Sequence, residues 1–322
     1  MWTHYRQTLI NGARMADSKN VLKTAYRSKA ARQEAKAAYL FLIPAFVGLT
    51  VLTYGPLLAV FGISFFNWRA GSPTLTFTGI TNYIRLFTED PYFKDSIKVT
   101  AYFTLLAVIG SLIYSLVIAM LLNRKIPARG FFRAIFYIPY VLPAVAVYMG
   151  WYLLYDTSFG FFNYILTLLN IDKVQFLQDS KLVVPSLVLI AVWLSGNLIV
   201  IFLAGLQNVP RVYYEAAEID GANSWQRFCN VTVPGMTPII FYNLLMAIVT
   251  NMQVVTPALA LTGGQPGNST RFMTYLMYYE AFRNGRLGHA SAISFIFFII
   301  VAIFTAILFV TSREWVFYEG DK

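Results

Sequence analysis

The sequence predicts an all-α polytopic membrane protein with six transmembrane helices. Hydrophobic residues make up 57% of the chain and charged residues only 12%, whereas about a quarter of the residues of a soluble domain are charged. The apolar residues also form six runs, each long enough at about 1.5 Å per residue to cross a hydrocarbon core about 30 Å thick. These runs span residues 40–66, 99–122, 134–155, 182–206, 237–261 and 290–311.

The chain begins with a basic segment, residues 1–38, which holds eight Lys or Arg against one Asp and one Glu. No apolar signal-peptide core or small-residue cleavage site precedes Leu40, so we expect a cytoplasmic tail. It either lies on anionic headgroups as an amphipathic helix or is simply solvated. A transmembrane domain is predicted over 39–313, interrupted by a polar segment at 207–236, and a short cytoplasmic tail over 314–322.

Loop charges predict the orientation of the spans. Sixteen Lys or Arg lie in the N-terminal tail, the 124–133 loop, the 207–236 segment and the C-terminus, against eight in the loops 67–96, 156–181 and 262–289. Cytoplasmic loops carry the excess of Lys and Arg. Both termini and the 207–236 segment are therefore predicted to be cytoplasmic, and this asymmetry explains the net charge of +10 without nucleic acid as a partner.

Two of the three loops on the opposite side, 67–96 and 156–181, are each predicted to hold a short amphipathic helix, at 81–87 and 161–169. The last of these loops, 262–289, contains Arg271, Arg283 and Arg286 against Glu280 alone. A basic mouth of this kind attracts acidic substrates, or it docks an acidic protein. Both interpretations stay open at this point.

The polar segment 207–236 is predicted to form two short helices. Pro210 suits a first helical position, and Gly221 follows the first helix, which is expected to end near Asp220. Asn223 or Ser224 can cap the second helix, around residues 225–230, before Pro234. The first helix has an apolar face at Val212, Ala216 and Ile219, and its carboxylates Glu215, Glu218 and Asp220 are expected to be solvated. Small residues keep its surface shallow, which suits docking of a partner: Ala216, Ala217, Gly221 and Ala222.

A motif in this segment carries a resemblance to a known family. Glu215, Ala216 and Ala217 are followed after two residues by Asp220, Gly221 and Ala222, then after five residues by Phe228 and after five more by Pro234. This pattern resembles the EAA loop of the membrane subunits of bacterial ABC importers. Further positions are similar to carbohydrate-importer permeases of the maltose type: Gly79, Asn82, Tyr83, Asp90, Phe93, Thr100, Gly160 and Asn163. The long basic tail departs from that type.

The resemblance implies a permease in the bacterial cytoplasmic (inner) membrane, forming half of a translocation pathway for an oligosaccharide. It implies that residues 215–217 and 220–222 form a coupling helix. The implied partners are a second homologous permease subunit, two cytoplasmic ATP-binding subunits, an extracytoplasmic solute-binding protein and the lipid bilayer. ATP and Mg²⁺ would be bound by the ATPases, with no cofactor in this chain. As a whole, the chain also resembles permeases for uronate oligosaccharides such as alginate fragments.

Neutral polar residues within two of the apolar runs are candidates for a sugar-binding surface. Amides bind hydroxyl groups, aromatic rings cover apolar sugar faces, and unpaired polar groups at membrane depth are costly. The alternative is interhelical hydrogen bonding, although the resemblance favours Asn251 because that family carries sugar-contacting amides at a comparable place. The candidates are Trp193, Ser195 and Asn197 in the fourth run and Asn243, Thr250, Asn251 and Gln253 in the fifth.

The sequence offers little chemistry for catalysis. It has no G-x-x-x-x-G-K-[ST] motif, one cysteine and two distant histidines, so no catalytic or metal-ligating residue is predicted. None of its fifteen carboxylates lies within an apolar run, which disfavours an ion-coupled carrier, because such carriers usually need buried ionisable groups. A primary-transport permease, a secondary sugar carrier and a membrane scaffold remain as alternatives, in that order.

Overall fold

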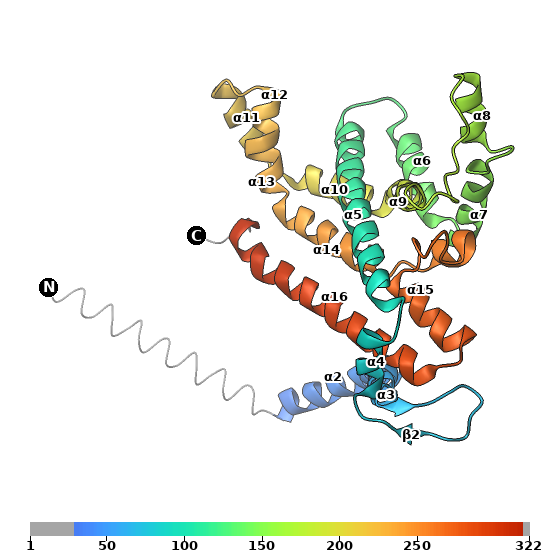
Figure 1. Cartoon of the computed structure of the whole chain (residues 1–322). Coiled ribbons are helices and arrows are strands. Elements are labelled where there is room, and N and C mark those ends of the chain that lie inside the picture. The colour runs from blue at the N-terminus through green and yellow to red at the C-terminus, as the bar shows by residue number, and fades with distance from the viewer. Residues whose placement is uncertain (1–28, 318–322) are drawn as a thin grey trace. The chain divides into compact units, whose positions relative to one another are not determined.

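The computed structural model describes residues 29–317 and is mostly helical, with one short pair of strands (Figure 1). Most of the predicted basic tail (1–28) and the end of the predicted C-terminal tail (318–322) lie outside the described residues. The chain divides into two compact units, Met1–Val60 and Phe61–Lys322. The first contains α2 (Lys29–Gly48), the π-helix η1 (Leu49–Tyr54) and the start of α3 (Gly55–Ile63). Together these give a continuous apolar helix of 31 residues, Gln33–Ile63.

The second unit contains the remaining elements. A two-stranded antiparallel ribbon pairs Phe66 with Phe77 and is followed by helices only. In chain order the elements are β1 (Phe66–Asn67), β2 (Thr76–Phe77), α4 (Thr81–Thr88), α5 (Phe93–Asn123), α6 (Arg129–Val141), α7 (Ala144–Leu154), α8 (Phe161–Leu168), α9 (Val183–Trp193), α10 (Gly196–Asn208), α11 (Arg211–Ile219), α12 (Ser224–Arg227), η2 (Phe228–Thr232), α13 (Val233–Gly235), α14 (Thr237–Met252), η3 (Ala258–Thr262), α15 (Met273–Tyr278), η4 (Tyr279–Arg283) and α16 (Leu287–Trp315).

Helix α5 is the centre of the second unit and packs against α9, α10 and α14. Its buried face is rich in small residues, which let neighbouring helices approach closely. A Cβ on Gly110 would lie 2.7 Å from the Val192 side chain, and the Ser115 hydroxyl lies 2.9 Å from that of Ser195. The buried residues on this face include Thr104, Ala107, Val108, Ser111, Ser115, Ala119 and Leu122.

Two of the apolar runs that the sequence predicts as simple spans, 134–155 and 182–206, are bent, and a third bend lies where the polar segment meets the start of the fifth run. Helices α6 and α7 meet at 98°, α9 and α10 at 48°, and the α12–α13 segment meets α14 at 70°. Gly196 marks the second bend because a Cβ there would lie 2.6 Å from the Phe136 carbonyl oxygen. The fifth run is also shorter than predicted, since α14 ends at Met252. Three helices in the described part of the chain are long and apolar enough to cross a bilayer, or six spans result if each bent pair counts as one.

Both predicted loop helices are present. Helix α4 covers Thr81–Thr88 and α8 covers Phe161–Leu168, each within one residue of its predicted end. Asn163 fixes the loop around α8, because its buried amide donates to the carbonyls of Asp156 and Val174 and accepts from the Val174 N–H. Asn82 plays the same role at α4, donating to the carbonyls of Ser64 and Phe66.

Candidate functional site: an exposed helix pair, a cavity at helix breaks and a polar pocket

The polar segment folds as the predicted helix, turn and second helix. Helix α11 ends at Ile219, next to the predicted end near Asp220, and α12 begins at Ser224. Asn223 is the N-cap and forms a capping box with Gln226, at 2.9 Å and 2.8 Å. Pro210 is the N-cap of α11 and not its first helical residue, because its ψ of 133° is extended.

The residues of the EAA pattern terminate α11 in a Schellman motif. The Ala222 N–H donates to the Ala217 carbonyl at 2.9 Å, and the Gly221 N–H donates to the Glu218 carbonyl at 3.1 Å. Gly221 has a φ of 76°, a conformation that costs other L-residues free energy. The spacing between the two parts of the motif is therefore the spacing that this turn requires.

The apolar face predicted for α11 has no partner within the described part of the chain. Ile219 is 87% exposed, and Trp225 on α12 is 70% exposed. Glu218, which is exposed, lies 3.6 Å from the half-buried Arg227, and a pair this open to solvent contributes little to stability. An exposed apolar and acidic helix is suited to docking.

A cavity of about 400 Å³ lies between α5, the α6–α7 bend, the α9–α10 bend and the end of α14. Five of the seven predicted substrate residues line it, and two tyrosines that the sequence did not single out as substrate residues join them. One of them, Tyr148, is a buried wall of this cavity. The polar lining consists of Ser111, Tyr140, Tyr148, Ser195, Asn197, Thr250, Asn251, Gln253 and Thr256.

Several of these polar residues lie where helices stop. Ser195 is the N-cap of α10, and Gln253 is the C-cap of α14. Helix ends carry backbone groups without helical partners, and in membrane proteins such ends occur where they line a cavity. The Asn251 amide nitrogen donates to the Ala247 carbonyl one turn back at 2.8 Å, so the side chain is held in place on the cavity wall. This arrangement can bind hydroxyl-rich solutes.

The other two predicted substrate residues do not line this cavity. Trp193 packs edge-on against Trp151, 5.6 Å between ring centroids, and lines an apolar pocket with it. Asn243 is 0% exposed and donates to the Leu198 carbonyl at 3.3 Å, which joins α14 to α10. Its Oδ1 has no hydrogen-bond partner among the described groups. Both residues therefore have packing roles here.

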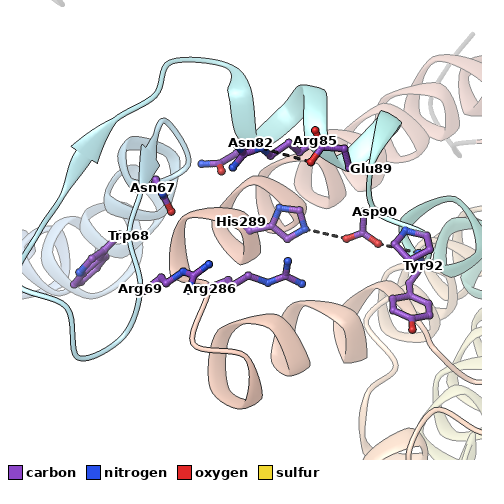
Figure 2. Close-up of a pocket in the computed structure, with 11 residues that line it drawn as sticks. Asn67, Trp68, Arg69, Asn82, Arg85, Glu89, Asp90, Tyr92, Arg286 and His289 are labelled. Carbon is purple, nitrogen blue, oxygen red and sulfur yellow. Dashed lines mark hydrogen bonds and ion pairs between the residues drawn. The ribbon is translucent and has the colours of Figure 1, made fainter.

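A polar pocket of about 260 Å³ lies where α4 and the starts of α5 and α16 meet (Figure 2). At its base the His289 Nε2 is 2.9 Å from the Asp90 carboxylate, with both side chains less than 10% exposed. Burial raises the pKa of Asp90, but the hydrogen bonds from His289 and from the N–H groups of Tyr92 and Phe93 outweigh it, so the net pKa lies below its ordinary value.

Two of the three arginines in the basic loop 262–289 have partners within the described residues. Arg286 pairs with the buried Glu280, 2.6 Å from Nε to Oε2. Arg271 lies over the Tyr92 ring at 3.8 Å, and Arg283 is exposed. Folding of this loop into α15 and η4 creates partners that its composition does not reveal.

Comparison with known proteins agrees with this architecture. Residues 111–316 match the family described as binding-protein-dependent transport system inner membrane component. The chain is 34% identical to the probable ABC transporter permease protein YesP of Bacillus subtilis (strain 168), with 92% of this chain and 96% of YesP aligned. It is 32% identical to the trehalose/maltose transport system permease protein MalF of Thermococcus litoralis, with 89% and 97% aligned.

The fold is also that of solved transporter chains. A chain from a bacterial ABC transporter involved in the import of the acidic polysaccharide alginate is similar at a TM-score of 0.77 and 21% identity, covering 88% of this chain and 96% of the other. With a family match over most of the chain and relatives above 30% identity along nearly its whole length, the chain belongs to the binding-protein-dependent inner membrane components, the permease subunits of ABC transporters.

Proposed function

We propose that this permease forms half of the translocation pathway of an ABC importer for an oligosaccharide. The observation that carries the proposal is the cavity at the helix breaks, lined by neutral amides, hydroxyls and tyrosines. These groups exchange hydrogen bonds between water and sugar hydroxyls, while tyrosine rings cover apolar sugar faces. The name of the MalF relative, a trehalose/maltose permease, supports a sugar substrate.

We further propose that α11 and its turn are the coupling helix. Glu215, Ala216 and Ala217 lie on α11, and the Schellman turn holds Asp220, Gly221 and Ala222 at its end. The exposed Ile219 and Trp225 supply apolar contact area for a cytoplasmic ATPase. ATP and Mg²⁺ are bound by the two ATPase subunits in this proposal, and neither is a cofactor of this chain.

Transport then follows from rigid-body motion. ATP binding closes the ATPases and moves the coupling helices of the two permease halves together, and the bundles rock from inward-facing to outward-facing. A solute-binding protein releases sugar into the opened cavity, and hydrolysis resets the transporter. In this arrangement the basic tail, both termini and α11 are cytoplasmic, six spans cross the inner membrane, and the second half is a homologous permease subunit.

Charged residues in the pathway distinguish the proposed function from two alternatives, an ion-coupled carrier and an importer of acidic sugars. An ion-coupled sugar carrier needs ionisable groups in its pathway, whereas the buried carboxylates Asp90 and Glu280 lie outside the predicted apolar runs. An acidic, uronate-type substrate is a second candidate because two similar structures are alginate transporters. None of the described residues that line the cavity is charged, which favours a neutral sugar.

The deciding experiment reconstitutes this chain with its second permease subunit and ATPase in lipid nanodiscs. ATP hydrolysis is measured with binding proteins loaded with neutral or uronate oligosaccharides. We expect stimulation by a neutral oligosaccharide on its binding protein. Equal sugar uptake into proteoliposomes without ATP, driven by an ion gradient, would contradict the proposal and favour a secondary carrier.

A further inference from the structure

We propose that the polar pocket shown in Figure 2 receives a carboxylate side chain of the solute-binding protein, with Arg69 as its main contact. The inference rests on the proposed function, since it assigns a docking position to a partner of the importer. It concerns a surface separate from the sugar cavity, because the two pockets share no lining residue.

The pocket is rigidly built. The Ala70 N–H donates to the Gly285 carbonyl at 2.7 Å, and the Gly288 N–H donates to the Trp68 carbonyl at 3.2 Å. A Cβ on Gly288 would lie 2.0 Å from the Phe66 carbonyl oxygen, so the start of α16 fits the ribbon this closely only with glycine. The loop that carries Trp68 and Arg69 is thereby held in place before any partner arrives, which lowers the entropic cost of binding.

The charges of the pocket leave one cation without a partner. Asp90 is paired with His289, Glu280 is paired with Arg286, and Arg85 lies 3.7 Å from Glu89. No hydrogen bond or ion pair within the described residues reaches the exposed Arg69 guanidinium. Arg69 is thus the cation of this small pocket whose charge the described residues leave uncompensated, and an incoming carboxylate lowers its electrostatic energy.

Size and residue type favour a protein side chain over a sugar. A pocket of about 260 Å³ admits an Asp or Glu side chain, but it is too small for an oligosaccharide, which needs a larger cleft. Its lining includes Trp68, Arg69 and Tyr92, and Trp, Tyr and Arg are the residue types that dominate interface energetics. The loop charges predict that this face is extracytoplasmic, where the binding protein docks.

The test measures the affinity of the loaded solute-binding protein for the reconstituted complex. Arg69→Glu should weaken binding about tenfold or more, and Arg69→Lys should lose less, because it keeps the charge but not the bidentate geometry. Lys181→Glu is the matched control, since Lys181 is an exposed cation of the 156–181 loop, on the same predicted face but outside the pocket and outside the basic 262–289 loop. It changes the net charge equally and should have a much smaller effect.

Three outcomes would overturn the inference. Unchanged affinity of the Arg69→Glu complex removes the pocket from the interface, and an equal loss with Lys181→Glu assigns the effect to overall charge. If acetate stabilises the wild-type complex but not Arg69→Glu while protein affinity is unchanged, the pocket binds a free anion. If no binding protein stimulates even the wild-type complex, the proposed function itself fails, which is a distinguishable result.

Discussion

Asp90 and His289 are 199 residues apart in the sequence, yet their side chains meet at 2.9 Å. The same Asp90 carboxylate accepts hydrogen bonds from the N–H groups of Tyr92 and Phe93 at the start of α5. His289 lies in the first turn of α16. One buried carboxylate therefore joins the N-terminal ends of two helices that are long enough to cross a membrane.

Asp90→Asn should destabilise the protein by about 1–3 kcal/mol at neutral pH, the cost of disturbing a buried hydrogen-bonded charge. Because the folded-state pKa of Asp90 lies below its ordinary value of 3.8, this contribution is complete above about pH 4 and is lost as the pH falls further. Melting temperatures in detergent between pH 7 and pH 3 measure it. The difference between wild type and variant should shrink only at the acidic end.

Asp95→Asn is the matched control for this variant. Asp95 is an exposed carboxylate in the first turn of α5 and lies 3.3 Å from Lys98, which is also exposed. Such pairs contribute little, so its melting temperature should stay close to that of the wild type. A comparable loss in both variants would assign the effect to the charge near the helix end and not to the pair with His289.

Cysteine labelling tests the predicted orientation. In a Cys229→Ser background, cysteines at Arg129 and Asn223 should react with a membrane-impermeant reagent only from the cytoplasmic side. Cysteines at Ser72 and Asp172 should react only from outside. The expectation follows from the sixteen-to-eight charge asymmetry. Reaction of the Asn223 position from the external side would contradict the orientation and the coupling role of α11 together.

Changes in the Schellman turn should uncouple transport from ATP hydrolysis. Gly221 has a φ of 76°, and no atom lies within 4 Å of the position that a Cβ would take, so Gly221→Val is strained by its backbone and not by crowding. We expect it to abolish sugar-stimulated ATPase activity while the binding protein still docks. Gly221→Asn is the control, because Asn tolerates the left-handed conformation, and it should retain most of the activity.

Glu215→Lys tests the proposed contact between α11 and the ATPase. Glu215 is exposed on α11, so reversing its charge should leave folding unchanged while repelling a basic residue of the ATPase. Glu215→Gln, which removes the charge but keeps the shape, should have a smaller effect. The measurement is ATPase affinity for the permease pair. Normal binding by Glu215→Lys would exclude Glu215 from the contact.

Local features were predictable from the sequence, while features set by distant contacts were not. The loop helix at residues 81–87 and the stop at Gly221 depend on neighbouring residues, and the structure confirms both. The bends of the third and fourth runs were missed, because hydropathy does not record that Gly196 lies against the Phe136 carbonyl. The pair of Asp90 and His289 was missed for the same reason.

The same limit separates the two asparagines of α14. Asn243 and Asn251 are eight residues apart, which rotates one side chain by about 80° relative to the other around a helix. That rotation is enough for Asn243 to face α10 while Asn251 lines the cavity. Sequence spacing alone does not reveal on which side of α14 a neighbouring helix lies. Both residues are therefore candidates for the sugar site when only the sequence is considered.

This difference leads to a paired prediction. If Asn251 binds a sugar hydroxyl, Asn251→Ala should raise the transport KM roughly fivefold, the effect of a hydrogen bond of about 1 kcal/mol. Its melting temperature should change little, because its hydrogen bond in the structure stays within its own helix. Asn243→Ala removes the bond between α14 and α10 and leaves a void at a fully buried position, so it should lower the melting temperature and leave KM unchanged. Measuring both quantities on both variants decides the matter: a destabilised Asn251→Ala protein with normal KM would make Asn251 a packing residue and remove it from the sugar site.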